Sequence, residues 1–264
     1  LLDQYQQDEG QRPDLLAAVS AATVAKILGG SLPAPQVLAA KLGPAALEGH
    51  ISAWAKRPDE ESFLGLVGMD NALPSSTDAN ASADGLAVVD NNASGNKIDN
   101  FLQRSIDYAP VYTRSSGTET ATLTVTLKNT APSSGYPDYV IGNTLGIPSG
   151  TNRTILSVYT RLAVSSFTVD GVKKSPTRDS ELGWNVYSRF IDIPPGGTVT
   201  VVLNMSGRTS AGSYQLLYRP QDLPHADTLT VHATSPSGAV VESYTGQPKR
   251  RSVIAANKIT AWTP

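Results

Sequence analysis

From Gly85 onward the sequence is a succession of short runs rich in β-branched and aromatic residues, separated by Gly, Pro, Asn and Asp. In the run from Ala121 to Leu127, apolar residues alternate with Thr, which places one face of a strand on a core and the other toward solvent. No helical pattern separates the runs, which favours an antiparallel immunoglobulin-like β-sandwich of about seven to ten strands. The predicted strands are Gly85–Asp90, Arg104–Thr113, Thr118–Asn129, Thr154–Thr160, Leu162–Asp170, Leu182–Ile193, Thr198–Asn204, Ser213–Arg219 and Thr228–Thr234.

One connection in this region carries a strong turn pattern. The segment from Pro194 to Gly197 reads Pro-Pro-Gly-Gly and separates two strand-like runs, Phe190–Ile193 and Thr198–Leu203. Proline and glycine at these positions are typical of a tight turn. The pattern therefore predicts that the two flanking strands pair directly in antiparallel fashion.

The beginning of the chain has a different composition. Residues 1–50 contain ten Ala and nine Leu, whereas Thr occurs twice before Thr113 and 22 times from there onward. Apolar residues at helical spacing predict a helix that opens at Pro13 and stops at Gly29-Gly30. A second helix is expected over 34–47, with Gly43-Pro44 ending or kinking it.

The segment after these helices mixes short elements with a connector. Ile51–Trp54 alternates like a short strand, and the Pro-Asp-Glu-Glu sequence at 58–61 predicts a helix over about 58–67. Residues 74–84 are rich in Ser, Ala, Asn and Asp, as surface connectors are. We therefore expect a helical segment over 1–73, a connector over 74–84 and the sandwich over 85–264.

Composition excludes several functional classes. Charged residues make up 17% of the chain and the formal net charge is -2, which argues against nucleic acid as a partner. The absence of Cys excludes disulfides, thiol nucleophiles and Cys-based zinc sites, and three His residues are too few for a His-rich metal site. No apolar stretch reaches the ~18 residues of a membrane span. Because the chain begins at Leu1 without a signal pattern, any signal or anchor is expected upstream.

One loop has the composition of a cation site. Asp90, Asn92, Asn96 and Asp99 surround Gly95, and calcium prefers many oxygen ligands of this kind. The spacing differs from that of an EF-hand. An Asx-rich turn explains the same residues, because Asn and Asp side chains bond their own backbone, and we favour the turn over calcium.

A second candidate is a general base. His50 precedes Asp59, Glu60 and Glu61 in the sequence, and acid/base catalysis requires such groups within hydrogen-bond reach. The acids also stand where a helix N-terminus favours negative charge, which is the interpretation that we favour. His225 and His232 lack the neighbours of a metal site. We assign no catalytic, metal or cofactor-binding residue, and no cofactor is expected.

The sequence resembles an actinobacterial cell-envelope family, the domain of unknown function numbered 4012. The resemblance rests on the Gly-His-Ile-Ser-Ala-Trp motif that opens 49–61, on the Val-Val-Asp-Asn-Asn-Ala-Ser-Gly segment that opens 88–99, and on 102–105 and 127–132. It covers most of the chain but begins inside the family, whose members carry a membrane anchor and a larger N-terminal portion. The helical segment is also similar to the last helices of LytR-CpsA-Psr phosphotransferases, whose pyrophosphate-binding arginines and metal ligands would precede Leu1.

These observations lead to one expectation and two alternatives. The expectation is a non-catalytic structural or interaction module, extracellular or at the cell surface, with wall polysaccharide or protein as partner. The first alternative is an accessory C-terminal part of a LytR-CpsA-Psr-like glycopolymer phosphotransferase whose active site lies upstream. The second is a processed fragment that stays assembled with its N-terminal partner or forms a homo-oligomer, since its helices carry apolar residues that need burial.

Overall fold

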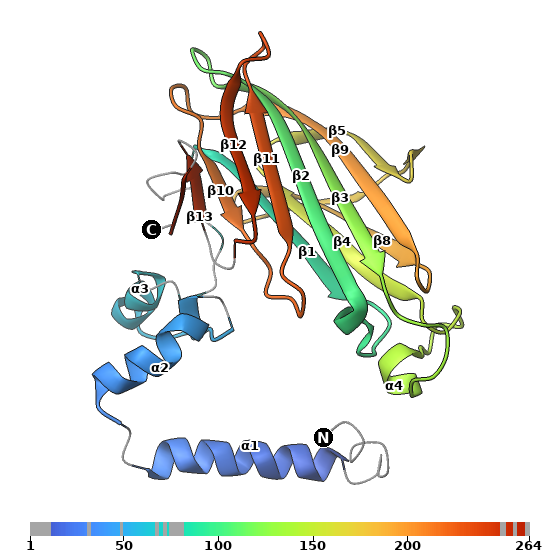
Figure 1. The fold of residues 1–264 in the computed structure, drawn as a ribbon. Coiled ribbons are helices and arrows are strands. Elements are labelled where there is room, and N and C mark those ends of the chain that lie inside the picture. Colours follow the sequence, from blue (N-terminus) through green and yellow to red (C-terminus); the bar gives the residue numbers. More distant parts are fainter. Residues whose placement is uncertain are drawn as a thin grey trace. The chain divides into compact units, whose positions relative to one another are not determined.

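The computed structural model describes residues 12–30, 33–47, 50–66, 69–70, 73, 82–248, 252–255 and 258–261. The chain divides into two compact units, Leu1–Ala45 and Ala46–Pro264, and the strands all belong to the second unit (Figure 1). The predicted connector, 74–84, lies mostly outside the described residues, so the predicted domain boundary there stays a prediction.

Three helices form near the predicted positions: α1 (Arg12–Gly29), α2 (Pro35–Leu47) and α3 (Pro58–Leu66). Gly43-Pro44 was expected to end or kink the second helix, and it does not end it, because α2 contains Pro44 and continues to Leu47. Pro44 lies in the last turn, where a missing N–H removes little of the remaining hydrogen-bond ladder. No described helix is both long and apolar enough to cross a membrane.

The predicted strand at Ile51–Trp54 is also wrong. This segment is irregular, and it is joined to the rest of the chain by a backbone bond from the Ala53 N–H to the Met69 carbonyl (2.9 Å). Four residues of alternating polarity form a strand only when the backbone of a neighbouring strand hydrogen-bonds them. Neither sheet contains a strand from the described residues 51–54.

The second unit is built from strands, and all nine predicted strands are present within a few residues of their expected bounds. The structure adds five strands that the sequence pattern did not reveal, namely β6, β7, β12, β13 and β14. Besides α3, this unit also contains a 3₁₀ turn (Ile98–Phe101) and the one-turn helix α4 (Asp138–Ile141). The strands are β1 (Asp84–Asn92), β2 (Leu102–Thr113), β3 (Thr118–Asn129), β4 (Asn152–Thr160), β5 (Ala163–Val169), β6 (Val172–Lys173), β7 (Thr177–Glu181), β8 (Trp184–Ile193), β9 (Thr198–Arg208), β10 (Leu216–Arg219), β11 (Thr228–Thr234), β12 (Val240–Gly246), β13 (Ser252–Ala255) and β14 (Lys258–Ala261).

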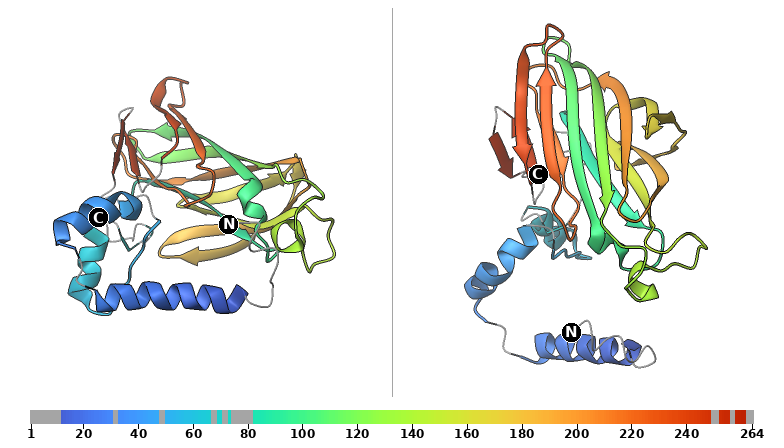
Figure 2. Two further views of the ribbon diagram at one scale, coloured as in Figure 1. Left: turned by 60° about the horizontal axis from the view of Figure 1, so that its bottom comes forward. Right: turned by 45° about the vertical axis from the view of Figure 1, so that its right-hand side comes forward.

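The strands form two seven-stranded sheets that face each other in a sandwich-like arrangement (Figures 1 and 2). Sheet A has the order β14-β13-β10-β1-β4-β8-β7, and sheet B has the order β12-β11-β2-β3-β9-β5-β6. The hydrophobic core lies between them and draws buried Leu, Val, Ile and aromatic side chains from both sheets. In β3 the predicted alternation is confirmed, because Ala121, Leu123, Val125 and Leu127 are buried while the Thr residues between them are partly exposed.

The expected all-antiparallel pairing is only partly correct, because both sheets are mixed. β10 runs parallel to β1, and β11 runs parallel to β2. Parallel neighbours require a connection that carries the chain back to the starting end. Here the chain supplies it by changing sheets, since β9 lies in sheet B, β10 in sheet A and β11 in sheet B again.

The turn at Pro194–Gly197 also has a different role from the one predicted. β8 belongs to sheet A and β9 to sheet B, so this turn is a corner between sheets and not a hairpin. Two consecutive prolines cannot donate to a ladder, which ends the pairing at this point. The buried Asn129 side chain holds the corner, with its Nδ2 donating to the carbonyls of Ile193 (3.0 Å) and Gly150 (2.7 Å).

Candidate functional site

A buried ion-pair network joins the two sheets near the start of β2. Arg104 donates through Nε and Nη2 to both carboxylate oxygens of Asp227 (2.8 and 2.6 Å) and through Nη1 to Asp90 (2.6 Å). The side chains are 0% exposed for Arg104 and 2% for each aspartate. Asp90 lies on β1 of sheet A, whereas Arg104 lies on β2 of sheet B. The guanidinium therefore holds Asp227, next to β11 of its own sheet, through a two-pronged pair, and reaches sheet A through the single bond to Asp90.

Gln221 extends this network at the edge of β1. The parallel pairing of β1 with β10 ends at Ala87 and Arg219. Beyond this point the side chain of Gln221, instead of a strand, hydrogen-bonds the backbone of β1. Its Oε1 accepts from the Asp90 N–H (2.7 Å) and its Nε2 donates to the Asp90 carbonyl (2.7 Å). One side-chain amide thus satisfies two backbone groups that would otherwise be unpaired in the interior.

The network contains two carboxyl groups for one guanidinium. Burial raises the pKa of Asp90, with smaller upward contributions from the charges of Asp227 and Asp99, and outweighs the opposite effect of Arg104. Burial lowers the pKa of Arg104, but Asp90 and Asp227 outweigh it and the net shift is upward. Asp90 Oδ2 is held by Arg104, while its Oδ1 is buried without a hydrogen-bond partner among the described residues. The arrangement is that of a structural ion pair with an excess of negative charge.

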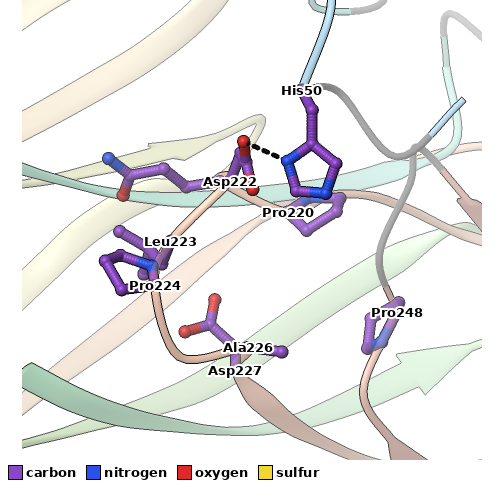
Figure 3. Close-up of a pocket in the computed structure, with 9 residues that line it drawn as sticks. His50, Pro220, Asp222, Leu223, Pro224, Ala226, Asp227 and Pro248 are labelled. Atoms are coloured by element: carbon purple, nitrogen blue, oxygen red, sulfur yellow. Dashed lines mark hydrogen bonds and ion pairs between the residues drawn. The ribbon is translucent and has the colours of Figure 1, made fainter. Parts of the chain in front are cut away.

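A pocket of about 210 Å³ lies above the network, formed by the loop between β10 and β11. Figure 3 shows that the loop carrying Asp222 and Pro224 runs along one side and that Pro248 lies on another. Asp227 and Gln221 belong both to the pocket lining and to the buried network. The described lining residues are His50, Pro220, Gln221, Asp222, Leu223, Pro224, Ala226, Asp227 and Pro248.

His50 and Asp222 form a pair at the rim of this pocket. Nδ1 of the imidazole lies 2.6 Å from Oδ2 of Asp222, and the side chains are 50% and 42% exposed (Figure 3). Part of the wall is apolar and stiff because three of the lining residues are proline. The pocket thus presents a carboxylate, an imidazole and an amide beside rigid apolar surface, and such groups can hydrogen-bond hydroxyl or amide groups of a ligand.

The structure separates the acids that the sequence placed near His50. Asp59 and Glu60 pair with Arg57 (2.6 and 3.6 Å), and the carboxylate of Glu61 accepts from the Ala55 N–H (2.7 Å). These contacts lie at the beginning of α3, which agrees with the interpretation of these acids as helix N-terminal charges. The partner of His50 is instead Asp222, which is 172 residues away in sequence.

The predicted loop over 90–99 contains an Asx turn. Asn92 Oδ1 accepts from the backbone N–H groups of Ser94 (2.7 Å) and Gly95 (3.1 Å), and Asn96 Oδ1 accepts from the Ile98 N–H (3.2 Å). Asp99 accepts from Asn152 (3.0 Å), while Asp90 faces Arg104. The described residues contain no group of three His, Cys, Asp or Glu residues that could hold a metal ion. Calcium binding is the alternative that we did not favour, and a thermal melt with added calcium tests it.

The remaining histidines are placed separately from these groups. His225 Nε2 lies 3.0 Å from the carbonyl oxygen of Asn100, and His232 lies on β11 with an exposed side chain.

Sequence reasoning missed Arg104, Gln221 and Asp227. A signal for Arg104 was present, because it occupies the same strand face as Leu102, Ile106 and Tyr108, all of which point into the core. A charge at an inward position of a strand requires a buried partner. The identity of that partner was beyond sequence reasoning, because Asp227 is 123 residues away.

No protein-family model matches this sequence, and no curated protein matches it. Similar solved structures include a candidate nutrient-binding protein of Legionella pneumophila, at 12% identity and a TM-score of 0.34 over 56% of this chain and 55% of that chain. They also include an M1 zinc metallopeptidase of Deinococcus radiodurans, at 13% identity and a TM-score of 0.32 over 58% of this chain and 40% of that chain. This chain thus spans about half or less of the length of these proteins. Similarities at these scores carry no conclusion about function.

Proposed function

We propose that this chain is a non-catalytic structural or interaction module of the cell envelope, with an immunoglobulin-like sandwich as its main part. The pocket over the Arg104 network is the surface through which it contacts a partner. The partner is wall polysaccharide, whose hydroxyl groups match the hydrogen-bonding groups at the pocket rim. The resemblance to the envelope family supports an extracellular or cell-surface location.

The observation that carries the proposal is how the pocket is attached to the core. The loop between β10 and β11 is fixed at one end by Gln221, which bonds the backbone of β1, and at the other by Asp227, which bonds Arg104. Both attachments are made inside the sandwich. A loop held in this way loses little conformational entropy when it binds, which favours recognition by a preformed surface.

The groups at the pocket rim are suited to hydrogen-bonding a ligand rather than to catalysing a reaction. Asp222 and His50 are half-exposed and hold each other at 2.6 Å, so they can accept and donate hydrogen bonds in a fixed direction. The proline rings beside them present rigid apolar surface against which the apolar part of a ligand can pack. The carboxyl group deeper in the pocket, that of Asp227, is already engaged twice by Arg104.

The test is a binding assay with purified envelope polysaccharides and a glycan panel. We expect Asp222→Asn and His50→Ala to weaken binding at least about tenfold, since each removes a charge or ring from the rim. Asp192→Asn is the matched control, because Asp192 is also an exposed carboxylate that holds a cationic partner, Arg153 (2.5 Å), and it lies away from the pocket lining. The proposal fails if no glycan binds above background, or if all three variants bind as the unmodified protein does.

A further inference from the structure

A second buried polar cluster lies farther along the same strands. Asp84 is the first residue of β1 in sheet A, and Glu119 is on β3 in sheet B. Each of these two acids is 1% exposed, and the tyrosines beside them, Tyr108 on β2 and Tyr214 just before β10, are buried as well. The cluster therefore spans the two sheets in the core.

The hydroxyl groups converge on Asp84. Oδ2 of Asp84 accepts from the hydroxyls of Tyr214 (2.6 Å) and Tyr108 (2.8 Å), and Oδ1 accepts from the Gly85 N–H (2.7 Å). Asp84 thus has three hydrogen-bond donors, and both of its carboxyl oxygens are engaged.

Glu119 is the carboxyl group with the weaker set of donors. Its Oε1 lies 3.3 Å from the Tyr108 hydroxyl oxygen, which is also 2.8 Å from Oδ2 of Asp84, so one hydroxyl group lies between the two carboxyl groups. Two carboxylates offer acceptors only, and one hydroxyl hydrogen cannot serve both, so this arrangement of two buried acids favours one added proton. The other oxygen, Oε2, accepts from the Thr209 hydroxyl (3.1 Å), as the carbonyl oxygen of a neutral acid can.

The electrostatic surroundings agree with this proton count. Burial, together with the nearby Asp84 carboxyl, raises the pKa of Glu119 from 4.5 to about 10, against the opposing effect of Thr209 and Tyr108. Burial and the charge of Asp84, and that of Glu119 once it is ionised, raise the pKa values of Tyr108 and Tyr214, so both tyrosines stay neutral donors.

A further tyrosine and an arginine complete the charged surroundings. Tyr112 on β2 has its pKa raised by burial and, once Glu119 is ionised, by the charge of Glu119, while the positive charge of Arg114 opposes the shift. Arg114 is thus the positively charged group that acts on Tyr112, opposite in sign to the acids of the cluster.

The cluster fastens the connection from β9 to β10, residues 209–215. Thr209 and Tyr214 of this segment bond Glu119 and Asp84, respectively. Three backbone N–H groups of this segment donate to backbone carbonyls: that of Thr209 to Gly117, that of Ser210 to Ser82 and that of Gly212 to Arg114. This is the segment that carries the chain from sheet B to sheet A and so makes the parallel pairing of β10 with β1 possible.

We propose that Asp84 and Glu119 share one proton and form a pH-sensitive latch that holds residues 209–215 across the two sheets. When the latch is protonated, the crossover is closed. When it loses its proton, two negative charges face each other in the core, and the crossover opens before the rest of the sandwich unfolds. This device is independent of the ligand of the pocket described above.

The sign of the pH effect follows from the direction of the pKa shift. Between the unfolded-state value near 4.5 and the folded-state value near 10, the folded protein binds one proton more than the unfolded chain. The contribution of the latch to stability is therefore complete below the lower value and decreases as pH rises. One proton corresponds to a loss of about tenfold in the folding equilibrium constant per pH unit.

The test is a series of denaturation curves from pH 5.5 to 9, with hydrogen exchange measured at residues 209–215. Glu119→Gln keeps the shape and the hydrogen bonds of the neutral acid, and we expect it to remove about one proton from the pH dependence and to slow exchange in this segment at alkaline pH. Asp192→Asn, an exposed carboxylate, is the control and should leave both unchanged. Equal pH slopes for the unmodified protein and Glu119→Gln would overturn the proposal.

A second measurement does not depend on any variant. Infrared difference spectra of the unmodified protein at pH 7 should show the carbonyl stretch of one protonated carboxylic acid, although ordinary Glu and Asp side chains are ionised at this pH. The absence of this band would also overturn the proposal.

Discussion

Arg104 shows how one side chain determines the interior at one end of the sandwich. It is fully buried and gives three charge-assisted hydrogen bonds of 2.6 to 2.8 Å to Asp90 and Asp227. A buried ion pair of this kind is a weak source of net stability, because both partners lose their hydration. Its main consequence is that neither acid can remain charged in the core if the guanidinium is removed.

We predict that Arg104→Met destabilises the protein by about 3 to 5 kcal/mol, because the methionine leaves two buried carboxyl groups without a cation. The loss should be smaller at pH 4 than at pH 7, because protonated aspartates carry no charge. Urea denaturation at the two pH values measures both effects. Arg153→Met provides the control, since Arg153 pairs with Asp192 at the surface, where ion pairs contribute little. An equal loss in both variants would contradict this account of Arg104.

At the scale of the elements, tight turns decide how strands and connections meet. Gly117, between β2 and β3, has φ +67°, and a Cβ at this position would overlap the carbonyl oxygen of Thr209. Gly95, in the loop after β1, has nearly the same φ of +68°, but nothing lies within 4 Å of a Cβ there. Comparing substitutions at the two glycines therefore separates the cost of a left-handed backbone from the cost of a clash between the new side chain and its neighbours.

We predict that Gly95→Ala costs about 1 kcal/mol from the left-handed conformation alone. Gly117→Ala should cost more than Gly95→Ala, because the 209–215 segment must also move away from the β2–β3 turn. Thermal unfolding of the two variants measures the difference, and hydrogen exchange at 209–215 should increase only in Gly117→Ala. Equal shifts in melting temperature would show that packing against Thr209 contributes nothing.

At the scale of the whole molecule, buried polar groups join the two sheets at several places. Arg104, the Asp84–Glu119 cluster and Asn129 are three of them. Asn129 lies at the end of β3, and its Nδ2 donates to the carbonyls of Gly150 and Ile193, which flank β4 and end β8 in sheet A. Its Oδ1 accepts from the Ala131 N–H (3.0 Å), so both ends of the amide are used.

We predict that Asn129→Asp destabilises the protein by about 2 to 4 kcal/mol at neutral pH, because a carboxylate cannot donate to two buried carbonyls and is itself buried. The loss should become smaller as pH falls, since a protonated acid regains one donor. Asn100→Asp is the control, because the Asn100 amide makes one exposed bond to the Lys97 carbonyl (3.0 Å). Chemical denaturation at pH 4 and pH 7 measures both variants, and a pH-independent loss would refute the role of Asn129 as a donor.

The local sequence by itself determined nine of the strands and, in β3, which side of the strand faces the core. In β3, the alternation of Leu and Val with Thr is a property of neighbouring residues, and burying every second side chain is the way to remove those apolar groups from water. The helices α1 and α3 were likewise visible in short patterns of proline, acids and apolar spacing. Predictions of this kind succeed because their causes lie within a few residues.

Only the tertiary structure decided how strands pair and which polar groups meet. The Pro-Pro-Gly-Gly turn predicts a reversal, but whether the next strand pairs with its predecessor or crosses to the other sheet depends on where Asn129 finds its carbonyl partners. Arg104 and Asp227, His50 and Asp222, and Asp84 and Glu119 are 123, 172 and 35 residues apart in sequence. Buried charges must find partners wherever folding brings them, so the network, the pocket and the latch exist only once both sheets have closed.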